Sequence, residues 1–579
     1  MAPLRRLVVK GPFRNIERQV QDRMEKVLTL FFTVRHLTRR QIVYRIYYGL
    51  RSIVSFPGGR AAARTYNRTL TLSPPILRKW DRRPHEFSFV GKTISFDHAD
   101  AIEWYPPSAS RLWQYHLHAF DYLVSDACIS DAHTAKNLVV SWITRHKKPS
   151  SAAGWAAFPL SLRVVNWIKW MHAVQCYDPV IIESLSLQYG ELLKKIEYNV
   201  LGNHLLKNIK AMVYCASCFS GEGKVLHKAV RLLCEEIDEQ ILKDGGHFEL
   251  SPMYHAAVLE DLLDVYSIVL RNPVLFGKYP GLSSRLETTI SRMLEWLEDM
   301  SFGNTPSFFN DVSQNESPTL AELRAYAVQS KVTINDRPPS LLTVKEDSGY
   351  SIIRLHPFRL IIDHGKVGPA YLPAHAHCDI FSFEVAKNDR RIFCNSGTDD
   401  YGNASTRQSL RSTRAHNTAM IDGQEQAEMW GTFRVARRPK QILSHVDETA
   451  SHIYFEGKHD GYKHQKSFLA DYTRKIRINK ESGQITVEDI YTGEGLHTIS
   501  SYLHFHPSVD VKPSGNKYSF SRSSDGISGS VEIHHCSCVE GAHQPFFEEF
   551  GCRQQHYCLS ISSSKLSPTI VSYTVSINQ

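Results

Sequence analysis

The residues Asn335-Asp336-Arg337-Pro338-Pro339-Ser340 separate two parts of the chain whose hydrophobic patterns differ. Charged and amide side chains next to two prolines are typical of a linker, because such a run supports neither a helix nor a sheet. Hydrophobic residues make up 42% and charged residues 22% of the 579 positions, which indicates a soluble globular chain rather than a fibrous or disordered one. The length leaves room for several domains.

Apolar residues before the linker recur with the helical period of three to four. One stripe contains Leu286, Ile290, Met293, Leu294, Leu297 and Met300, and an earlier one contains Val230, Leu233, Ile237 and Ile241. Similar segments extend from Leu112 to about Tyr326 without a strict sequence repeat. A series of helices of this length predicts an (α/α) toroid or a helical solenoid.

Short segments typical of strands follow the linker, among them residues 350–364, 485–490, 500–506 and 570–577. Turn sequences such as Glu481-Ser482-Gly483-Gln484 lie between them, and this pattern predicts an antiparallel β-sandwich. We therefore divide the chain into an N-terminal arm with a basic amphipathic segment (1–90), a helical toroid (91–335) and an antiparallel β-sandwich (341–579).

The N-terminal arm holds no candidate membrane span. Its longest apolar run, residues 28–34, ends at Arg35 and is much shorter than the about 20 residues that a span needs. No secretory signal is recognisable, which predicts a cytoplasmic location. Residues 35–51 alternate Arg with Leu, Ile, Val and Tyr. This pattern fits an amphipathic helix, either with its basic face in water or lying on an anionic membrane surface.

Charge and cysteine content exclude several classes of protein. Lys and Arg exceed Asp and Glu by 68 − 59 = 9, which is a small excess for this length, and the basic residues are scattered. We therefore expect no dedicated nucleic-acid partner. The 11 cysteines show no regular spacing. Cys215 and Cys218 lie in an apolar run and fit a helical core better than a redox site.

Two polar clusters precede the linker. Asn203 and His204 stand at the start of a helical run, where Asn203 could simply cap the helix. Residues 244–255 (DGGHFELSPMYH) form an irregular loop that carries Tyr254 and contains Ser251-Pro252, a typical helix start. Polar loops on a rigid scaffold are common homes of active residues.

Two further clusters follow the linker. His375 and His377 would point to the same face if the strand after them extends back that far, which suits a metal site or a histidine base. The alternative is two solvated edge histidines. The second cluster is rich in arginine, which binds carboxylate and sulfate with two hydrogen bonds, and a downstream Trp offers a face for sugar stacking. The candidate substrate-binding residues are Trp155, His247, Tyr401, Arg407, Arg411, Arg414 and Trp430.

These residue types suit β-elimination in an acidic polysaccharide. The C5 proton of a uronic acid becomes removable when Asn and His side chains neutralise the neighbouring carboxylate. A Tyr or His then takes this proton, and a Tyr hydroxyl can protonate the departing glycosidic oxygen. The catalytic candidates are Asn203, His204, Tyr254 and His375. A hydrolase would need two carboxylates, for which Asp244 and Glu249 are available without a supporting spacing.

The order and spacing of the clusters resemble those of the heparinase II/III-like polysaccharide lyases. The similar stretches are residues 113–117 (WQYHL), 155–167 (WAAFPLSLRVVNW), 203–205 (NHL), 244–254 (DGGHFELSPMY), 375–379 (HAHCD) and 414–418 (RAHNT). The resemblance covers most of the chain. It implies an incomplete (α/α) toroid followed by an antiparallel β-sandwich, an active cleft between them, and eliminative cleavage of uronate-containing polysaccharides.

The resemblance also implies roles for single residues. Asn203 and His204 correspond to the carboxylate-neutralising positions, Tyr254 to the catalytic tyrosine and His375 to the second proton-transfer residue. His377 and His416 correspond to two ligands of a structural zinc ion. Asn395 stands where relatives carry the third ligand, an Asp, and an amide oxygen is a weaker ligand for Zn²⁺.

The resemblance leaves location and activity open to alternatives. Members without a secretory signal and with a similar basic start are tied to cell-surface or exopolysaccharide pathways, so a periplasmic or cell-envelope location is also implied. A uronyl C5-epimerase begins with the same proton abstraction. A non-catalytic glycan-binding factor in surface-polysaccharide assembly would account for Asn395, but it has no evident need for all four catalytic candidates. We expect a carbon–oxygen lyase with an acidic polysaccharide as its partner.

Overall fold

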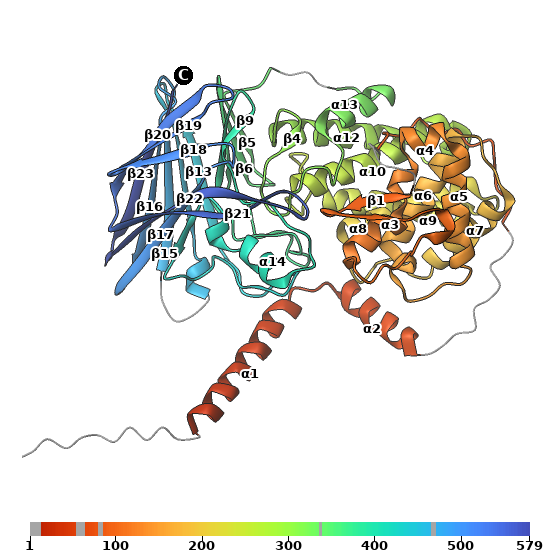
Figure 1. Cartoon of the computed structure of the whole chain (residues 1–579), viewed down its shortest axis with the longest axis horizontal. Helices are drawn as coiled ribbons and strands as arrows, with labels where there is room; N and C mark the ends of the chain where they lie inside the picture. The colour runs from red at the N-terminus through yellow and green to blue at the C-terminus, as the bar shows by residue number, and fades with distance from the viewer. Residues whose placement is uncertain (1–12, 54–63, 79–84, 335–337, 465–469, 579) are drawn as a thin grey trace, which may run out of the picture.

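The computed structural model of the chain describes residues 13–53, 64–78, 85–334, 338–464 and 470–578. Residues 335–337 of the predicted linker lie outside the described residues, and Pro338, Pro339 and Ser340 form neither helix nor strand. Helices dominate the chain before this point and antiparallel strands the chain after it (Figure 1). The predicted fold class, a helical toroid followed by a β-sandwich, is confirmed.

The α-helices of the first half are α1 (Phe13–Val34), α2 (Arg39–Ile53), α3 (Arg111–Ala119), α4 (Asp126–Ser130), α5 (Ala132–Arg145), α6 (Ala157–Ala173), α7 (Pro179–Leu192), α8 (Gly202–Cys218), α9 (Gly223–Gln240), α10 (Pro252–Arg271), α11 (Pro273–Phe276), α12 (Leu282–Asp299) and α13 (Leu320–Gln329). Short 3-10 helices are η1 (Ala99–Ala101), η2 (Asp121–Leu123) and η3 (Ala153–Trp155). Two hairpins complete this half, β1 (Glu86–Phe89) with β2 (Lys92–Ser95) and β3 (Ser301–Phe302) with β4 (Thr305–Pro306).

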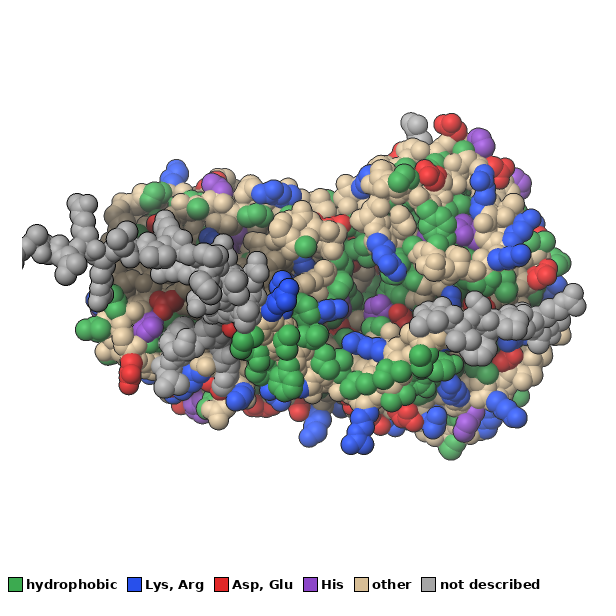
Figure 2. All heavy atoms as spheres, turned by 90° about the horizontal axis from the view of Figure 1, so that it is seen from below, with side chains coloured by type: hydrophobic (Ala, Val, Ile, Leu, Met, Phe, Trp, Pro, Cys, Tyr) green, Lys and Arg blue, Asp and Glu red, His purple; other side chains and the backbone are tan. Residues whose placement is uncertain are grey.

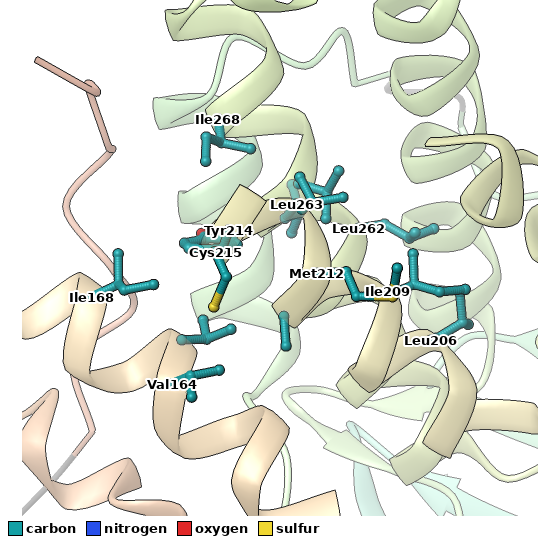
Figure 3. Close-up of a cluster of buried hydrophobic side chains, with 14 of the residues drawn as sticks. Val164, Ile168, Leu206, Ile209, Met212, Tyr214, Cys215, Leu262, Leu263 and Ile268 are labelled. Carbon is teal, nitrogen blue, oxygen red and sulfur yellow. The ribbon is translucent and has the colours of Figure 1, made fainter. Parts of the chain in front are cut away.

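Helix α8 forms the centre of the toroid, because almost all of its side chains are buried rather than one stripe alone. It packs between α6, α9 and α10. Figure 3 shows Ile168 of α6, Cys215 of α8 and Leu263 of α10 within one hydrophobic cluster. The two cysteines of α8 are free and buried, as expected of core residues.

The first hairpin belongs to this helical unit. Phe87 is fully buried in the toroid core and contacts the ring of Tyr122. The turn between β1 and β2 contains Val90 and Gly91. A domain division between residues 90 and 91 therefore separates two strands that pair with each other.

Three antiparallel sheets build the second half. The first contains, in spatial order, β5 (Leu342–Lys345), β6 (Tyr350–Leu355), β7 (Phe358–Asp363), β8 (Phe383–Lys387) and β9 (Arg390–Phe393). The second contains β13 (Ile442–Glu448), β14 (His452–His459), β15 (Ala470–Asn479), β16 (Ile485–Gly493), β23 (Thr569–Ile577), β20 (Ile527–His535), β19 (Lys517–Arg522) and β18 (Asp510–Ser514). The third contains β10 (Ala419–Ile421), β17 (Leu496–His504), β22 (Cys552–Leu566) and β21 (Cys538–Glu549). Shorter elements are α14 (Ala404–Leu410), η4 (Thr413–Ala415), β11 (Met429–Trp430), β12 (Arg434–Val435) and η5 (Gly461–His464).

Alternation of side chains explains how these sheets pack. Along β16, Ile485, Val487, Asp489 and Tyr491 are buried, and the alternate residues Thr486, Glu488 and Ile490 are partly exposed. Leu503 of β17 and Leu559 of β22 belong to the same buried cluster as the buried apolar residues of β16. The inner faces of the eight-stranded and four-stranded sheets therefore share one core, as in a sandwich.

A separate hydrophobic cluster joins the two halves. Trp296 at the end of α12 and Leu250 before α10 pack against Tyr350 and Ile352 of β6, together with Phe309. This contact holds the loops around residues 250 and 310 against the β-domain, where the candidate site lies.

Helices α1 and α2 lie outside both units (Figure 1). Thr29 and Thr33 of α1 contact the β-domain, and Gln41 and Tyr48 of α2 contact the toroid and its neighbouring loop. Within the described ranges, no helix combines the length and apolarity that a bilayer crossing requires.

Candidate active site

A cavity of about 160 Å³ lies where the toroid meets the β-domain. Asn203 and Lys207 of α8 line it from the toroid, together with Tyr254 of α10. Tyr401 lines it from the β-domain. The cavity thus brings together two of the catalytic candidates and one predicted substrate-binding residue, from segments almost 200 positions apart.

Tyr254 is placed by the start of α10. The Ser251 side chain accepts a hydrogen bond from the Tyr254 backbone N–H at 3.2 Å, and Pro252 begins the helix, which confirms the predicted capped start. The Tyr254 ring stacks on the His375 imidazole with centroids 3.7 Å apart. Its hydroxyl lies 3.0 Å from the Tyr401 hydroxyl. Burial raises the pKa of Tyr254, and the nearby Asp311 charge adds to this effect, so the phenol keeps its proton.

Asp311 is the centre of the polar network behind Tyr254. Its Oδ2 accepts from His375 Nδ1 at 2.8 Å and from the Tyr401 hydroxyl at 3.3 Å, and its Oδ1 accepts from His377 Nε2 at 2.8 Å. Arg407 forms a two-pronged ion pair with the same carboxylate. Burial alone would raise the pKa of Asp311, but Arg407 and the two histidines hold it well below its usual range.

The positions of the two histidines differ from expectation. Residues 375 and 377 lie in an irregular loop, and β8 begins only at Phe383, so the predicted same-face strand geometry is wrong. Both side chains nevertheless reach the two oxygens of one carboxylate and are buried, which also excludes two solvated edge histidines. Asp311 follows the buried pair Phe308 and Phe309, and no motif in the sequence marked it.

Glu249 fixes Asn203 on the other side of His375. Its carboxylate accepts from the backbone N–H and from the side-chain amide of Asn203, each at 3.0 Å, and lies 3.3 Å from His375 Nε2. Helix α8 begins at Gly202, and the preceding Leu201 has no side-chain cap, so the interpretation of Asn203 as a helix cap is wrong. Gly202 has φ +60°, and a Cβ there would meet Glu249 Oε1 at 2.6 Å. Only glycine lets this carboxylate approach the helix start.

His204 follows on the same first turn of α8. A third of its side chain is exposed, its Nδ1 lies 2.9 Å from Glu197 Oε1, and its ring packs on Phe158. Burial opposes its protonation, but Glu197 outweighs this effect and raises the pKa of His204. Glu197 therefore favours the imidazolium form of His204. Because His204 lies at a helix N-terminus, the backbone N–H groups there would also stabilise a bound carboxylate.

Several residues beside the site adopt left-handed backbone conformations. Leu201, Leu250, Asn310 and Phe381 have φ of 71°, 58°, 59° and 61°. The first three each lie one or two positions from a polar residue of the network just described. Phe381 lies two positions from Asp379, whose carboxylate accepts from the Asn310 N–H at 2.9 Å. Such conformations cost on the order of 1–3 kcal/mol each and concentrate where the surrounding structure holds functional groups in place.

The chemistry of His377 and His416 fits a zinc ion in part. His377 Nδ1 and His416 Nε2 face each other at 3.0 Å. The outer nitrogens contact acceptors, Asp311 Oδ1 at 2.8 Å and the Ser412 carbonyl oxygen at 2.9 Å. Burial lowers the pKa of both rings, that of His377 to about 3, so each ring carries one proton, on its outer nitrogen. Two lone pairs then face each other, as in zinc-binding histidines whose other nitrogen donates to an oxygen.

Asn395 does not fit as the third ligand. Its Oδ1 accepts from Ser382 Oγ at 2.7 Å and from the Asn417 backbone N–H at 3.1 Å, which occupies both lone pairs. Its Nδ2 is buried and has no hydrogen-bond partner among the residues that the structure describes. Over the part of the chain that the structure describes, no group of three or more His, Cys, Asp or Glu side chains could hold a metal ion.

Several predicted substrate-binding residues have structural positions instead. Arg407 and Arg411 are buried, Arg407 against Asp311 and Arg411 against the carbonyl oxygens of Ala376 and Gly431, so neither guanidinium is available to a glycan. Trp155 is 1% exposed and packs in the toroid core, where its ring lies 5.6 Å from that of Trp142. These three predictions are wrong because the side chains support the fold.

The remaining three candidates also lie away from the cavity lining. His247 is fully buried and contacts Gln240 Oε1 at 3.0 Å. Trp430 donates its indole N–H to Thr33 of α1 at 2.9 Å. Arg414 is exposed but is not among the residues that line the cavity. Tyr401 alone of the seven candidates lines it.

The lysines and arginine that line the cavity are paired with carboxylates. Lys207 contacts Asp261 at 2.8 Å, Lys169 contacts Asp264 at 2.7 Å, and Lys210 contacts both acids. Arg78 pairs with Glu260 at 2.7 Å in the same way. The cavity wall on the toroid side is therefore polar and close to neutral, despite its four basic side chains.

The chain resembles known polysaccharide lyases. A heparin-sulfate lyase of Bacteroides thetaiotaomicron is 21% identical over 460 residues, which cover 69% of this chain and 62% of that protein. A heparin-sulfate lyase of Bacteroides stercoris is 25% identical over 313 residues, which cover 49% of this chain and 44% of that protein. The chain thus spans less than two thirds of the length of these curated relatives.

Solved structures share the fold. The crystal structure of a heparinase III has a TM-score of 0.68 at 18% identity and is matched over 93% of this chain and 89% of its own. The heparan sulfate lyase of Pedobacter heparinus has a TM-score of 0.56 at 15% identity, over 93% and 88% of the two chains. Residues 78–330 match the family model described as the heparinase II/III N-terminus, and residues 337–570 match that of the heparinase II/III-like C-terminal region. The chain belongs to the heparinase II/III family.

Proposed function

We propose that the chain is a polysaccharide lyase that cleaves uronate-containing chains by β-elimination. The observation that carries the proposal is the stack of Tyr254 on His375 at the cavity, with His375 bonded to Asp311 directly and Tyr254 linked to it through the Tyr401 hydroxyl. Two proton carriers thus meet beside a helix N-terminus that suits a carboxylate. The kinship with heparin-sulfate lyases supports the same class of reaction.

The first step is neutralisation of the uronate carboxylate. His204 stands at the start of α8 with its cationic form favoured by Glu197. Asn203, held by Glu249, lines the cavity next to it. Contacts to these groups stabilise the charge that develops on the carboxylate when the C5 proton leaves.

His375 and Tyr254 then divide the proton transfers. The short bond from Nδ1 to Asp311 fixes the proton on that nitrogen, so Nε2 accepts the C5 proton, and Asp311 and Glu249 flank the imidazolium that forms. The electron pair of the C5–H bond forms the C4=C5 double bond, and the C4–O bond breaks. Tyr254 keeps its proton at rest because burial raises its pKa, and it delivers this proton to the departing oxygen.

The paired cations of the cavity also favour one kind of substrate. Because Lys169, Lys207 and Lys210 are occupied by Asp261 and Asp264, they do not stand free to bind sulfate groups. We therefore favour a polymer whose charge comes from uronate carboxylates over one that is densely sulfated.

The test is a panel of acidic polysaccharides, sulfated and unsulfated, read by the ultraviolet absorbance of 4,5-unsaturated uronate ends. Unsulfated polymers should give the faster rise in absorbance. Saturated products would contradict the elimination mechanism, and deuterium uptake at C5 without chain shortening would instead identify an epimerase. Tight binding of a glycan without turnover would point to a binding protein.

A zinc ion, if bound, would be held by His377 and His416, whose lone pairs face each other. It would supply positive charge that fixes the loop behind Asp311, outside the proton transfers. Metal analysis of the purified protein should then find zinc that is lost from a His416→Ala variant, with a lower Tm. The assignment would be contradicted if the purified protein contained no zinc and if treatment with a chelator left its Tm unchanged.

A further inference from the structure

Helix α1 turns its apolar side away from the protein. Most of the side chains that contact the β-domain are polar: Thr29 donates to Glu428 at 2.7 Å, Thr33 accepts from Trp430 at 2.9 Å, and Glu25 pairs with Arg437. The one aromatic exception among the described contacts is Phe32, whose ring lies 4.8 Å from the Arg437 guanidinium. On the opposite side, large apolar residues recur every three to four positions and are 38–66% exposed. They are Met24, Val27, Leu28, Phe31 and Val34.

Helix α2 repeats this inverted arrangement on the toroid. Gln41 is fully buried and donates to the carbonyl oxygens of Val200 and Tyr371, and the Tyr48 hydroxyl donates to Ile196 at 2.5 Å. The outward side carries apolar residues that are 40–61% exposed. They are Ile42, Val43, Ile46, Tyr47 and Leu50. A helix of a globular protein normally buries its apolar face, so both helices lack the surface that would cover theirs.

The two apolar faces share one side of the molecule. In Figure 2, hydrophobic side chains gather in two neighbouring areas at the positions of α1 and α2, with Lys and Arg side chains beside them. Since α1 is attached to the β-domain and α2 to Ile196 and Val200 of the toroid, this side spans both halves of the protein.

Basic residues outnumber acidic ones around these faces. Residues 23–51 contain seven basic side chains and one acidic side chain, Glu25, which is engaged with Arg437. Exposed basic residues on the two helices and between them are Arg23, Lys26, Arg35, Arg39 and Arg45. Long basic side chains beside an apolar stripe can reach anionic headgroups while the stripe enters the acyl boundary.

We propose that the outward faces of α1 and α2 dock the protein on an anionic lipid bilayer. The apolar stripes insert into the interface, and the basic residues bind the headgroups. A second copy of the chain is a poorer occupant, because it would place these arginines and lysines against their own like charges. The docking does not depend on the proposed lyase reaction.

Vesicle co-sedimentation of the full chain tests the proposal. The probes are vesicles of phosphatidylcholine alone and of phosphatidylcholine mixed with phosphatidylglycerol. The chain should bind the anionic vesicles, bind less at high salt, and bind the neutral vesicles weakly. A Phe31→Gln/Ile46→Gln variant should lose roughly tenfold or more in partition, since burial of one large apolar side chain is worth about that factor.

A matched variant separates this surface from ordinary exposed residues. Val274 is 99% and Leu566 is 72% exposed, and neither lies on α1 or α2. A Val274→Gln/Leu566→Gln variant should therefore bind vesicles as the unmodified chain does. Both double variants should keep the Tm, because the replaced side chains are exposed.

Three outcomes would overturn the proposal. The first is absence of binding to both kinds of vesicle, and the second is an equal loss of binding in both double variants. The third is a dimer in analytical ultracentrifugation that the Phe31→Gln/Ile46→Gln variant dissociates, while the same variant still binds vesicles. A variant with Arg39→Gln and Arg45→Gln should weaken binding to anionic vesicles only, which separates the charge contribution from the apolar one.

Discussion

Two buried polar regions border the same cavity and are built in different ways. On the toroid wall, Lys207 and Lys210 of α8 face Asp261 and Asp264 of α10, each pair of residues three positions apart on its helix. At the β-domain, Asp311 collects partners that are 64 to 96 positions away in the chain, such as His375 and Arg407.

The difference lies in how charge is distributed. In the toroid wall, opposite charges cancel between neighbouring helices, and the pairing fixes the helices to one another. Around Asp311, one carboxylate accepts from several donors. One of them is the proton carrier His375, and another is Tyr401, whose hydroxyl contacts the second proton carrier, Tyr254. A proton that moves at the cavity therefore changes the interactions of Asp311, whereas the toroid wall is unaffected.

The largest effect on activity should come from Tyr254→Phe. The variant removes the proton that we assign to the leaving oxygen and keeps the ring stacked on His375. We expect the initial rate to fall about 10²–10⁴-fold with an unchanged Tm. The measurement is ultraviolet absorbance of the product together with thermal unfolding.

Tyr115→Phe is the matched control for this prediction, because Tyr115 lines the same cavity but its hydroxyl accepts from Arg111, whereas the Tyr254 hydroxyl contacts Tyr401. It should retain activity. Full activity of Tyr254→Phe would contradict the assignment, as would an equal loss in both variants.

The next effect concerns stability as well as activity. Asp311→Asn leaves the buried Arg407 without its carboxylate, which should cost about 3–5 kcal/mol in the free energy of unfolding and also lower the rate. Arg474 and Asp489 form a second fully buried pair, with 2.7 Å between Nε and Oδ1, inside the β-domain. Denaturant titrations of Asp311→Asn and Asp489→Asn should show similar losses.

Activity separates the two variants. Among molecules that remain folded, Asp489→Asn should have an unaltered rate, whereas Asp311→Asn should not, because Asp311 contacts His375 and Asp489 pairs with Arg474 instead. Equal specific activities would show that Asp311 has a structural role alone.

The same contrast explains what could be predicted from the sequence. Helical spacing predicted the stripe that begins at Leu286, which lies in α12 and ends one residue beyond it at Met300. The Ser251-Pro252 pair predicted the helix start that places Tyr254. Both depend on residues close in the chain. Alternation predicted the strands in the same way.

The loops could not be predicted by these means. Asp311 and Glu249 acquire their roles by contacting His375. The three residues lie in three separate loops, where the sequence shows no periodic hydrophobic pattern that could predict the contacts. Arg407 and Arg411 share the sequence signature of a surface cluster, and only tertiary packing shows that Asp311 and backbone carbonyls occupy them. Residue type indicated the chemistry, and long-range geometry decided which residues perform it.

A smaller effect on activity should follow from removing one carboxylate that neutralises the lysines of the toroid wall. Asp261→Asn removes a partner of Lys207 and frees a positive charge at the cavity. We expect the ratio of kcat/KM for sulfated over unsulfated polymers to rise and the free energy of unfolding to fall, because the pair is buried and Lys207 loses its carboxylate partner. Glu235→Gln, which loosens an exposed pair with Arg231 on α9, should leave the ratio unchanged. A ratio that stays constant in Asp261→Asn would contradict the view that pairing of the lysines disfavours sulfated chains.

The smallest change should be a shift of the pH profile. Glu197 raises the pKa of His204, so the imidazolium persists to higher pH and carboxylate binding is lost as the pH rises through this pKa. In Glu197→Gln the pKa falls, and the descending limb of kcat/KM should move to lower pH while rates at acidic pH coincide. The pair also contributes stability only below this limb, because the folded pKa is the higher one. Asp422→Asn removes the partner of a different histidine, His497, whose pKa is likewise raised, and should leave the activity profile in place. A profile that Glu197→Gln does not move would mean that His204 acts in its neutral form, and the helix start of α8 would then supply the positive potential for the carboxylate.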